Sequence, residues 1–365
     1  MKTFDEVFVD KTKYGVKVQT SEYGKSGIHI IVDQGQSQIA GYTDREDGLF
    51  KEVPAIVFGD HTRVIKYVNE PFFLGADGLK VLRSKDENAN YKYLYYALKN
   101  AKIPDTGYNR HFKWLKKIQI EYPDSNEQAK IVKILDEASY IISKKKAEIQ
   151  ALDNLIKARF VEMFGTLHDN ENGFEVVTIE DVCSLIKDGT HQTPQYTENK
   201  EDGFKFLSSK DVMSQKIDWT DIKYIPAELH EKLYATIKPQ RNDILMSKNG
   251  VNYGVAAVND TDEIFDIYVS LALLRPKEEI DPVFLRCVIN NPETKRQFDS
   301  SIKGIGVPNL HLGEIKKTKI FLPPIELQKE FVSFAEQVNK SKAVVQKSLE
   351  ETQLLFDSLM QKYFG

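Results

Sequence analysis

The stretch IFLPPIELQKEFV (Ile320–Val332) runs an apolar, strand-like segment into two prolines and then directly into a charged, helix-forming segment. A second stretch, IQIEYPDSNEQAKIV (Ile118–Val132), has the same punctuation. Proline cannot donate a hydrogen bond to a sheet, so Pro123 and the Pro323-Pro324 pair are each expected to end a strand. The chain therefore contains two copies of one strand–proline–helix joint.

The two joints belong to a longer internal repeat. Displacing the sequence by 200 residues aligns Leu115–Gly165 with Ile315–Gly365 without a gap. Identical residues then coincide along the whole repeat: Lys116-Lys117 with Lys316-Lys317, Ile120 with Ile320, Gln128 with Gln328, Val132 with Val332, Leu155 with Leu355, and Phe164-Gly165 with Phe364-Gly365. Few positions match, but the unbroken register and the shared Phe-Gly ending indicate a duplicated unit.

Each copy predicts one long helix after its joint. Ser125 and Gln128 have capping-box spacing, and the helical pattern runs for about 38 residues, or roughly 57 Å. Apolar residues step by fours and threes, the coiled-coil period, and lysine, arginine or threonine interrupts the seam at 145, 159, 342 and 352. The predicted seam residues are Ile131, Leu135, Ala138, Ile142, Ile149, Leu152 and Ile156, with Phe331, Val338, Val345, Leu349, Phe356 and Leu359. Packing one stripe against the other buries both; two core helices of one large domain are the alternative.

Weaker similarity extends the repeat upstream of both joints. The matching pairs are TFDEV (Thr3–Val7) with TIEDV (Thr178–Val182), GIHIIV (Gly27–Val32) with GFKFLS (Gly203–Ser208), AIVFGD (Ala55–Asp60) with DILMSK (Asp243–Lys248), and LKVLRSK (Leu79–Lys85) with LALLRPK (Leu271–Lys277). We therefore predict an α+β protein with two small β-rich domains at 1–122 and 166–322, and long helices at 123–165 and 323–365. A pseudo-twofold relation between the halves makes the two helices antiparallel.

Composition narrows the class of protein. No apolar run approaches the roughly 18–20 residues needed to span a bilayer, and the N-terminus has no signal-like core. The two cysteines, Cys183 and Cys287, favour a reducing compartment and have no zinc-ligand spacing. A cytoplasmic protein is the expectation.

The order of parts, the LPPIELQ joint before a long helix, and loop stretches such as GTHQTPQY and DILMSKNG resemble the specificity subunit of type I restriction–modification enzymes. The resemblance covers essentially the whole chain. It implies two target-recognition domains that read the parts of a split, asymmetric double-stranded DNA site, with the helices setting the gap. It also implies docking of two methyltransferase subunits and of restriction–translocase subunits. S-adenosylmethionine, ATP and Mg²⁺ are then expected on the partner subunits and no cofactor on this chain. The two joints differ at one position of this motif: the second copy has Leu327 where the first has Glu127.

Base readout needs forked donors and acceptors on loops held by a rigid scaffold. Three loop pairs carry such residues, and ordinary turn formation is the alternative reading of each. The candidate DNA contacts in the first domain are His61, Thr62, Arg63, Lys66, Thr106, Tyr108, Arg110, His111 and Lys113. In the second they are Thr190, His191, Gln192, Thr193, Lys248, Asn249, Asn252 and Lys303.

The charge distribution is unequal between the two domains. Residues 1–114 carry 17 basic and 15 acidic residues, whereas residues 166–314 carry 16 basic and 25 acidic ones, a net charge of −9. Since phosphate contacts supply much of the affinity for DNA, the second domain is expected to bind DNA with help from partner subunits.

Catalytic motifs are missing from the sequence. It contains no P-loop ending in GK[ST], no Gly-rich cofactor loop in a strand–helix setting, and no Asn/Asp-Pro-Pro-aromatic motif, so we expect a non-catalytic subunit. Two alternatives stay open: a coiled-coil adaptor that does not bind DNA, and the specificity subunit of a system in which methylase and nuclease are fused.

Overall fold

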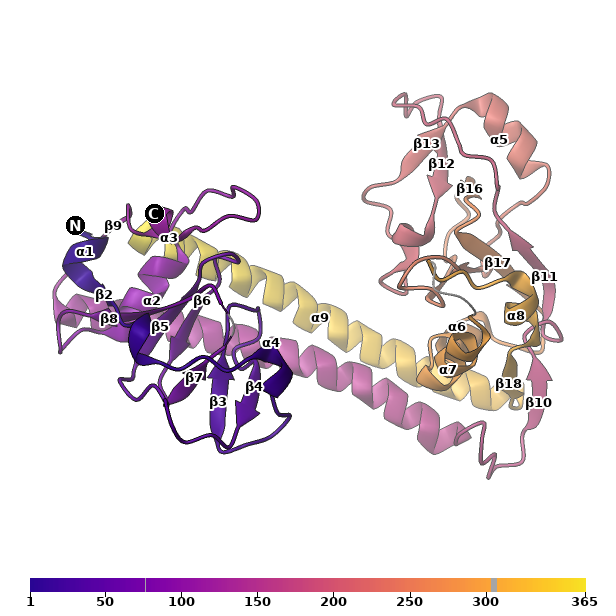
Figure 1. Cartoon of the computed structure of the whole chain (residues 1–365). Coiled ribbons are helices and arrows are strands. Elements are labelled where there is room, and N and C mark those ends of the chain that lie inside the picture. The colour runs from indigo at the N-terminus through magenta and orange to yellow at the C-terminus, as the bar shows by residue number, and fades with distance from the viewer. Residues whose placement is uncertain (76, 303–306) are drawn as a thin grey trace. The chain divides into compact units, whose positions relative to one another are not determined.

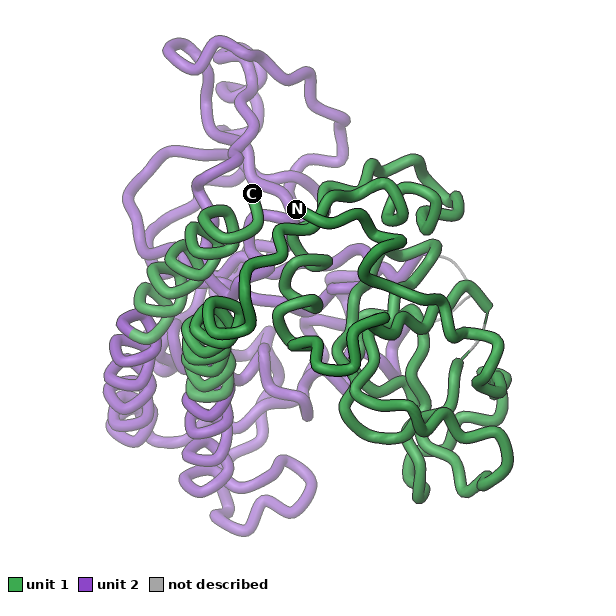
Figure 2. The backbone as a smooth tube through the Cα atoms, turned by 90° about the vertical axis from the view of Figure 1, so that its left-hand side faces the viewer, with its two compact units in different colours: residues 1–148, 345–365 green, residues 149–344 purple. Residues whose placement is uncertain are grey.

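The computed structural model describes residues 1–75, 77–302 and 307–365, in two compact units. Unit 1 comprises residues 1–148 and 345–365, and unit 2 comprises residues 149–344. Both chain termini therefore belong to unit 1 (Figure 2). Each unit combines a β-rich domain with one half of each long helix.

Unit 1 is built from short strands and helices (Figure 1). Its strands are β1 (Lys2–Thr3), β2 (Phe8–Asp10), β3 (His29–Val32), β4 (Gly41–Thr43), β5 (Ala55–Gly59), β6 (Ile65–Val68), β7 (Phe72–Leu74), β8 (Leu79–Ser84) and β9 (Gln119–Ile120). Its helices are α1 (Phe4–Val7), α2 (Tyr91–Lys99), α3 (Phe112–Leu115) and the first part of α4 (Ser125–Phe164).

Unit 2 repeats this plan with longer connections. Its strands are β10 (Glu175–Thr178), β11 (Cys183–Asp188), β12 (Phe204–Leu207), β13 (Lys223–Ile225), β14 (Ile244–Ser247), β15 (Ala256–Val258), β16 (Phe265–Ile267), β17 (Leu271–Pro276) and β18 (Lys319–Leu322). Its helices are α5 (Ala227–Tyr234), α6 (Pro282–Ile289), α7 (Pro292–Ser301), α8 (Leu312–Lys317) and the first part of α9 (Ile325–Phe364).

Strand order proves the internal repeat. The four-stranded sheet β2-β8-β5-β6 of unit 1 corresponds to β11-β17-β14-β15 of unit 2. The three-stranded sheet β4-β3-β7 corresponds to β13-β12-β16, and in both the second pairing is parallel. The two-stranded ladders β1-β9 and β10-β18 also match. The α+β repeat expected from the sequence is confirmed.

The TFDEV motif of unit 1 and the TIEDV motif of unit 2 form the same hydrogen-bonded turn. The Glu6 carboxylate accepts hydrogen bonds from the Thr3 backbone N–H and hydroxyl, each 2.7 Å. The Asp181 carboxylate accepts from the Thr178 backbone N–H (2.8 Å) and hydroxyl (2.7 Å) in the same way. A capping turn thus follows the first strand of each domain, where the chain leaves the ladder for the core.

The joints contain a feature that the sequence reading assigned incorrectly. The capping box of Ser125 with Gln128 is wrong: Asp124 caps α4, its carboxylate accepting from the Glu127 backbone N–H at 2.9 Å. The buried Gln128 side chain instead donates back to the Pro123 carbonyl at 2.9 Å. Gln328 makes the equivalent bond to the Pro323 carbonyl at 2.8 Å. The repeated glutamine therefore fastens each helix to the strand end before it.

Within each unit the long helices pair with opposite polarity. In unit 1 the beginning of α4 and the end of α9 share one core with the domain, in which Leu135 and Phe356 are buried. In unit 2 the end of α4 meets the beginning of α9, where the Phe160 and Phe331 rings lie 5.4 Å apart. Every predicted seam residue is buried or half-buried.

Three of the four polar residues that interrupt the seam join the two helices, whereas the Thr352 hydroxyl donates to the Ser348 carbonyl of its own helix at 2.7 Å. Lys145 donates to the Ser348 hydroxyl at 2.7 Å in unit 1. In unit 2, Arg159 pairs with Glu330 at 3.1 Å and Lys342 with Asp153 at 2.5 Å. These contacts add directional bonds to the apolar packing on both sides of the midpoint of the pair.

Candidate nucleic-acid interface

In unit 1 two distant loops meet at the end of β5. The buried Asp60 backbone carbonyl accepts from the His111 backbone N–H at 2.8 Å and lies 3.0 Å from His111 Nδ1. The Asp60 carboxylate accepts from the Phe112 backbone N–H at 2.6 Å. These bonds attach the loop before α3 to the turn between β5 and β6.

Further bonds fix the shape of this loop pair. Arg63, with a left-handed backbone (φ 62°), reaches across to the Asp105 carboxylate at 2.7 Å. The Gly107 backbone N–H donates to the same carboxylate at 3.0 Å, and with Arg63 it holds the pKa of Asp105 below its usual value. Because Arg63 is committed to Asp105, its charge is partly neutralised before any DNA arrives.

Unit 2 builds the same loop pair at the end of β14. The Lys248 backbone carbonyl accepts from the Leu310 N–H at 2.8 Å, and the Gly250 N–H donates to the Pro308 carbonyl at 3.0 Å. The Asn249 side-chain amide donates to the Asn309 side chain at 3.1 Å. The structure thus brings together segments about 60 residues apart in unit 2, as it brings together segments about 50 apart in unit 1.

The predicted contact residues differ in accessibility. The exposed ones are Thr62, Thr106, Tyr108, Arg110, Lys113, His191, Gln192, Thr193 and Asn252. His61, Arg63, Thr190 and Asn249 are partly exposed, and Lys66, His111 and Lys248 are buried. Lys303 lies outside the described residues.

The three buried residues have structural partners instead of a free surface. Lys66 donates to the Ser37 carbonyl at 2.5 Å and lies 3.5 Å from Asp33, and burial lowers its pKa. Lys248 forms an ion pair with Asp188. His111 is held by Asp60. In this structure these three side chains hold the loops in place and are not exposed to a ligand.

The sequence reading missed a third loop in unit 1. Gln34 follows β3, and its side-chain oxygen accepts from the His61 N–H at 3.2 Å while its backbone carbonyl accepts from the Thr62 hydroxyl at 2.6 Å. Gln36 and Gln38 nearby are exposed. The cluster of glutamines in DQGQSQ (Asp33–Gln38) was the available signal, since side-chain amides are suited to reading adenine.

Two orphaned polar atoms lie at equivalent places in the two loop pairs. His61 Nδ1 and Asn249 Oδ1 are buried side-chain atoms without a hydrogen-bond partner. His61 follows Asp60, whose carbonyl accepts from the His111 N–H, and Asn249 follows Lys248, whose carbonyl accepts from the Leu310 N–H. Unsatisfied buried polar atoms are costly, so each of these two atoms gives its loop pair an unused hydrogen-bonding group.

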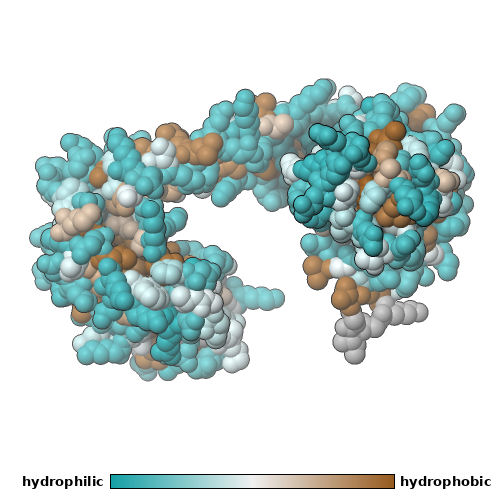
Figure 3. Space-filling model, turned by 90° about the horizontal axis from the view of Figure 1, so that it is seen from above, coloured by the Kyte–Doolittle hydropathy of each residue, from teal (hydrophilic) through white to brown (hydrophobic). Residues whose placement is uncertain are grey.

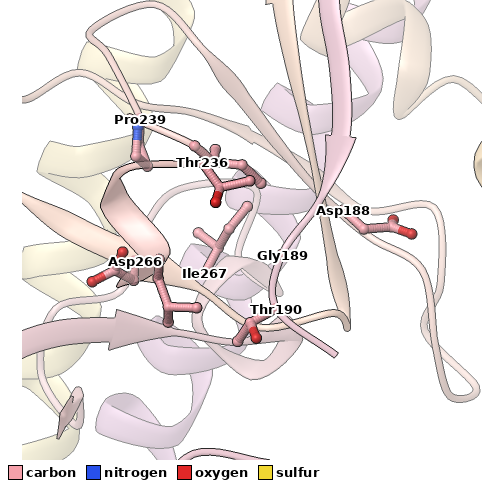
Figure 4. A pocket seen from close by; sticks show the side chains of 9 residues that line it. Asp188, Gly189, Thr190, Thr236, Pro239, Asp266 and Ile267 are labelled. Carbon is pink, nitrogen blue, oxygen red and sulfur yellow. The ribbon is translucent and has the colours of Figure 1, made fainter. Parts of the chain in front are cut away.

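A cavity of about 170 Å³ lies beside Thr190 in unit 2 (Figure 4). Its walls come from the end of β11, the α5–β14 connection and β16. In Figure 4 the Asp188 carboxylate points away from the other lining side chains, consistent with its pairing to Lys248. The second acid, Asp266, is bound to His230 at 2.7 Å. Both acids are thus committed. Across the described ranges no cluster of three His, Cys, Asp or Glu residues could hold a metal ion.

Comparison with known proteins gives the family. Residues 2–152 and 171–352 match the family described as type I restriction modification DNA specificity domain. The chain belongs to this family. It is a type I restriction–modification specificity subunit, a non-catalytic component of these enzymes.

Relatives of this specificity subunit agree with the assignment. It is 23% identical over 308 residues to the type I restriction enzyme MjaVIII specificity subunit of Methanocaldococcus jannaschii, covering 76% of this chain and 72% of that one. It is 30% identical over 151 residues to the EcoR124I/EcoR124II specificity subunit of Escherichia coli, covering 38% and 37%. The fold matches the S subunit of a type I system from M. genitalium, with a TM-score of 0.60, 17% identity, and coverage of 100% and 95%.

The long helices also carry large apolar side chains that are at least 39% exposed. They are Ile134, Tyr140, Ile141, Leu354 and Leu355 in unit 1, and Leu155, Val161 and Val344 in unit 2. Figure 3 shows apolar surface interrupting the hydrophilic surface over the helices. None of the helices in the described ranges is long and apolar enough to cross a membrane. Both units thus carry exposed apolar side chains on their long helices, and such side chains are candidates for protein contacts.

Proposed function

We propose that this specificity subunit reads a bipartite, asymmetric double-stranded DNA target, one part with each β-rich domain, and carries methyltransferase and restriction subunits on its helices. One observation carries the proposal: two copies of one scaffold present equivalent loop pairs with different side chains. The domains at 1–122 and 166–322 are the readers, and the helices at 123–165 and 323–365 are the connectors. Because the loop pairs differ, the two parts of the target differ.

Mapping modified bases in the source genome tests this function. With the gene intact, a split motif with a constant gap is expected to be methylated; deletion of the gene is expected to remove the modification at all such sites. A matched strain carrying the gene with Thr106 and Arg110 replaced by alanine is expected to lose or relax one part of the motif only. Unchanged methylation after deletion would refute a specificity role.

The acidic second domain needs help to hold DNA. Residues 166–314 have a net charge of −9, and phosphate neutralisation drives most DNA affinity. The isolated chain is therefore expected to bind duplex weakly and with strong salt dependence, and the assembled complex tightly. A gel shift in which the isolated chain binds tightly in high salt would contradict this division of labour.

Partner docking is best tested on the exposed apolar side chains of the long helices. Charged substitutions at Leu135 or Ile142 would disturb buried packing, because these side chains are 0% and 8% exposed. Ile134 and Ile141, 39% and 44% exposed, are the matched surface positions. Ile134→Asp/Ile141→Asp is expected to abolish copurification with methyltransferase, expected at two copies per chain, without loss of fold. Intact copurification would remove this face from the docking surface.

The helices are proposed to set the gap between the two parts of the target. The contacts Lys145–Ser348 in unit 1 and Asp153–Lys342 in unit 2 define which residues of α4 and α9 lie opposite each other. An insertion that keeps these pairs together must lengthen both helices equally. A four-residue insertion within Ala147–Asn154 is therefore best matched by one between Lys342 and Ser348. The paired insertion is expected to lengthen the methylated gap, whereas the single insertion also disrupts pairing. An unchanged gap in the paired variant would refute the ruler role.

A further inference from the structure

Tyr108 is the most exposed aromatic side chain among the described large hydrophobic residues, at 90%. Its ring lies on that of His61, with centroids 4.9 Å apart and planes inclined by 11°. His61 therefore lies beside part of one face of the Tyr108 ring. Its exposure leaves the opposite face open to solvent.

The loop that carries Tyr108 is held in place. Asp105 is fastened to Arg63 at 2.7 Å, Gly107 turns with φ +73°, and its N–H donates to Asp105 at 3.0 Å. His111 closes the other end on Asp60. The tyrosine is thus presented on a braced turn, which lowers the entropy lost when its free face meets a ligand.

The surroundings select the chemistry of that ligand. Residues 102–117 hold five basic residues and one acidic residue, and the acid is the Asp105 already paired with Arg63. The Trp114 ring lies 5.5 Å from Lys113 Nζ and 4.7 Å from Lys117 Nζ. Cations interleaved with aromatic rings suit a polyanion that also offers π faces, which describes nucleic acid.

The second domain has the same loop pair without this ring. Ser301–Leu310 contains no aromatic residue, and Val307 and Pro308 belong to the described part of this segment. The Pro308 carbonyl accepts from the Gly250 N–H at 3.0 Å, so Pro308 lies beside the turn that follows β14. The nearby exposed side chains, Val251 and Val307, are aliphatic and cannot extend a base stack.

We propose that Tyr108, backed by His61, stacks on a nucleobase in the part of the target read by the first domain, and unstacks that base from its neighbour. The distortion is expected in this part, because the sequence of the corresponding loop of the second domain, Ser301–Leu310, has no aromatic residue. This inference rests on the proposed function, since it needs DNA on the loop pair. A protein partner seated on Tyr108 is the competing occupant.

The test uses the assembled methyltransferase complex and a duplex containing the mapped methylation motif. Fluorescent base analogues (2-aminopurine for adenine, pyrrolocytosine for cytosine) replace one base at a time in both parts, and anisotropy reports binding separately. Stacking quenches these analogues, so enhanced fluorescence is expected at the base left without its stacked neighbour, at one position in the first part and at no position in the second, outside the methylated base itself. Tyr108→Ala is expected to abolish the enhancement and weaken binding roughly 5- to 150-fold, the range for loss of one stacked base. Tyr108→Phe is expected to retain both.

Val307→Ala is the matched control in the second domain and is expected to change neither readout. Binding by the wild-type complex without enhancement in the first part would overturn the stacking role and leave the proposed function standing. Loss of methyltransferase from the Tyr108→Ala chain would assign the ring to a protein partner instead. A wild-type complex that does not bind the duplex at all would overturn both proposals.

Discussion

The two units share one arrangement of strands but place different side chains at corresponding buried positions. Phe73 of β7 and Asp266 of β16 occupy the same register, opposite Ile31 and Phe206 in the parallel ladders. Phe73 is buried in an apolar cluster, whereas Asp266, 2% exposed, bonds to His230 at 2.7 Å. The same strand position thus accepts a buried aromatic ring in unit 1 and one member of a buried polar pair in unit 2. Strand order in this fold is maintained while interior chemistry and loop side chains diverge.

Breaking the polar pair is expected to have the largest effect. His230→Leu leaves the Asp266 carboxylate buried without its partner, and we expect the free energy of unfolding to fall by about 3–5 kcal/mol at pH 7. His230→Leu/Asp266→Phe, which imitates unit 1, is expected to recover most of this loss. Chemical denaturation measures both, with hydrogen exchange localising the change to unit 2. Equal losses in the single and double variants would show that the two solutions are not interchangeable.

The same pair gives a signed dependence on pH. Burial raises the pKa of Asp266 above its ordinary value of 3.8. A carboxyl group with a raised folded pKa binds its proton more tightly when folded, so its contribution to stability is present below pH 3.8 and lost as pH rises through the folded value. The His230→Leu variant is therefore expected to lose less stability near pH 4 than at pH 7. A larger loss at pH 4 would contradict the assignment.

Replacing Gln128 or Gln328, the glutamine at each strand–proline–helix joint, is expected to lower the free energy of unfolding by an intermediate amount. Gln328 is fully buried and bonds to three backbone groups: the carbonyls of Pro323 (2.8 Å) and Glu279 (3.1 Å) and the N–H of Asp281 (2.9 Å). Gln128 makes one such bond, to Pro123. Because each unsatisfied buried group is costly, Gln328→Leu is expected to lower the free energy of unfolding by about 2–4 kcal/mol and Gln128→Leu by about 1. Thermal or urea unfolding would show the ranking, and a reversed order would contradict it.

Polar contacts between the helices are expected to matter least. Lys342 pairs with the charged Asp153, and Lys145 with the neutral Ser348 hydroxyl. Both sites are partly exposed, so Lys342→Met and Lys145→Met are each expected to cost less than about 1 kcal/mol. Only the Lys342 effect should shrink when salt rises from 50 mM to 1 M, because screening weakens an ion pair. Equal salt dependence in urea unfolding would argue against this difference.

Much of the fold was readable from the sequence because the repeat is long and periodic. The 200-residue register predicted the paired helices and their seam, since burial of two apolar stripes leaves few arrangements. The cap of α4 was misread because Asp124 and Ser125 are adjacent and both residue types cap helices. In the structure the Asp124 carboxylate accepts from the Glu127 N–H, and the Gln128 side chain donates to the Pro123 carbonyl, so Asp124 and not Ser125 is the cap.

The sequence predicted loops that meet in the structure, but not which of their side chains are exposed. Lys66 has the chemistry of a phosphate contact, yet it shares the inward face of β6 with Val68, an alternation visible in the sequence. Lys248 is buried because Asp188, 60 residues earlier, meets it in space, which no local pattern shows. The exposed Tyr108 was identified, but its stacking on His61 depends on two loops converging.

The most direct test of two independent readers on one scaffold is a hybrid chain. Residues 1–114 are exchanged for the corresponding segment of another type I specificity subunit, and methylated bases are mapped in a strain that carries the hybrid. The expected result is a motif with one part replaced, the other part retained and the gap unchanged. Alteration of both parts, or of neither, would contradict the assignment of one part of the target to each unit.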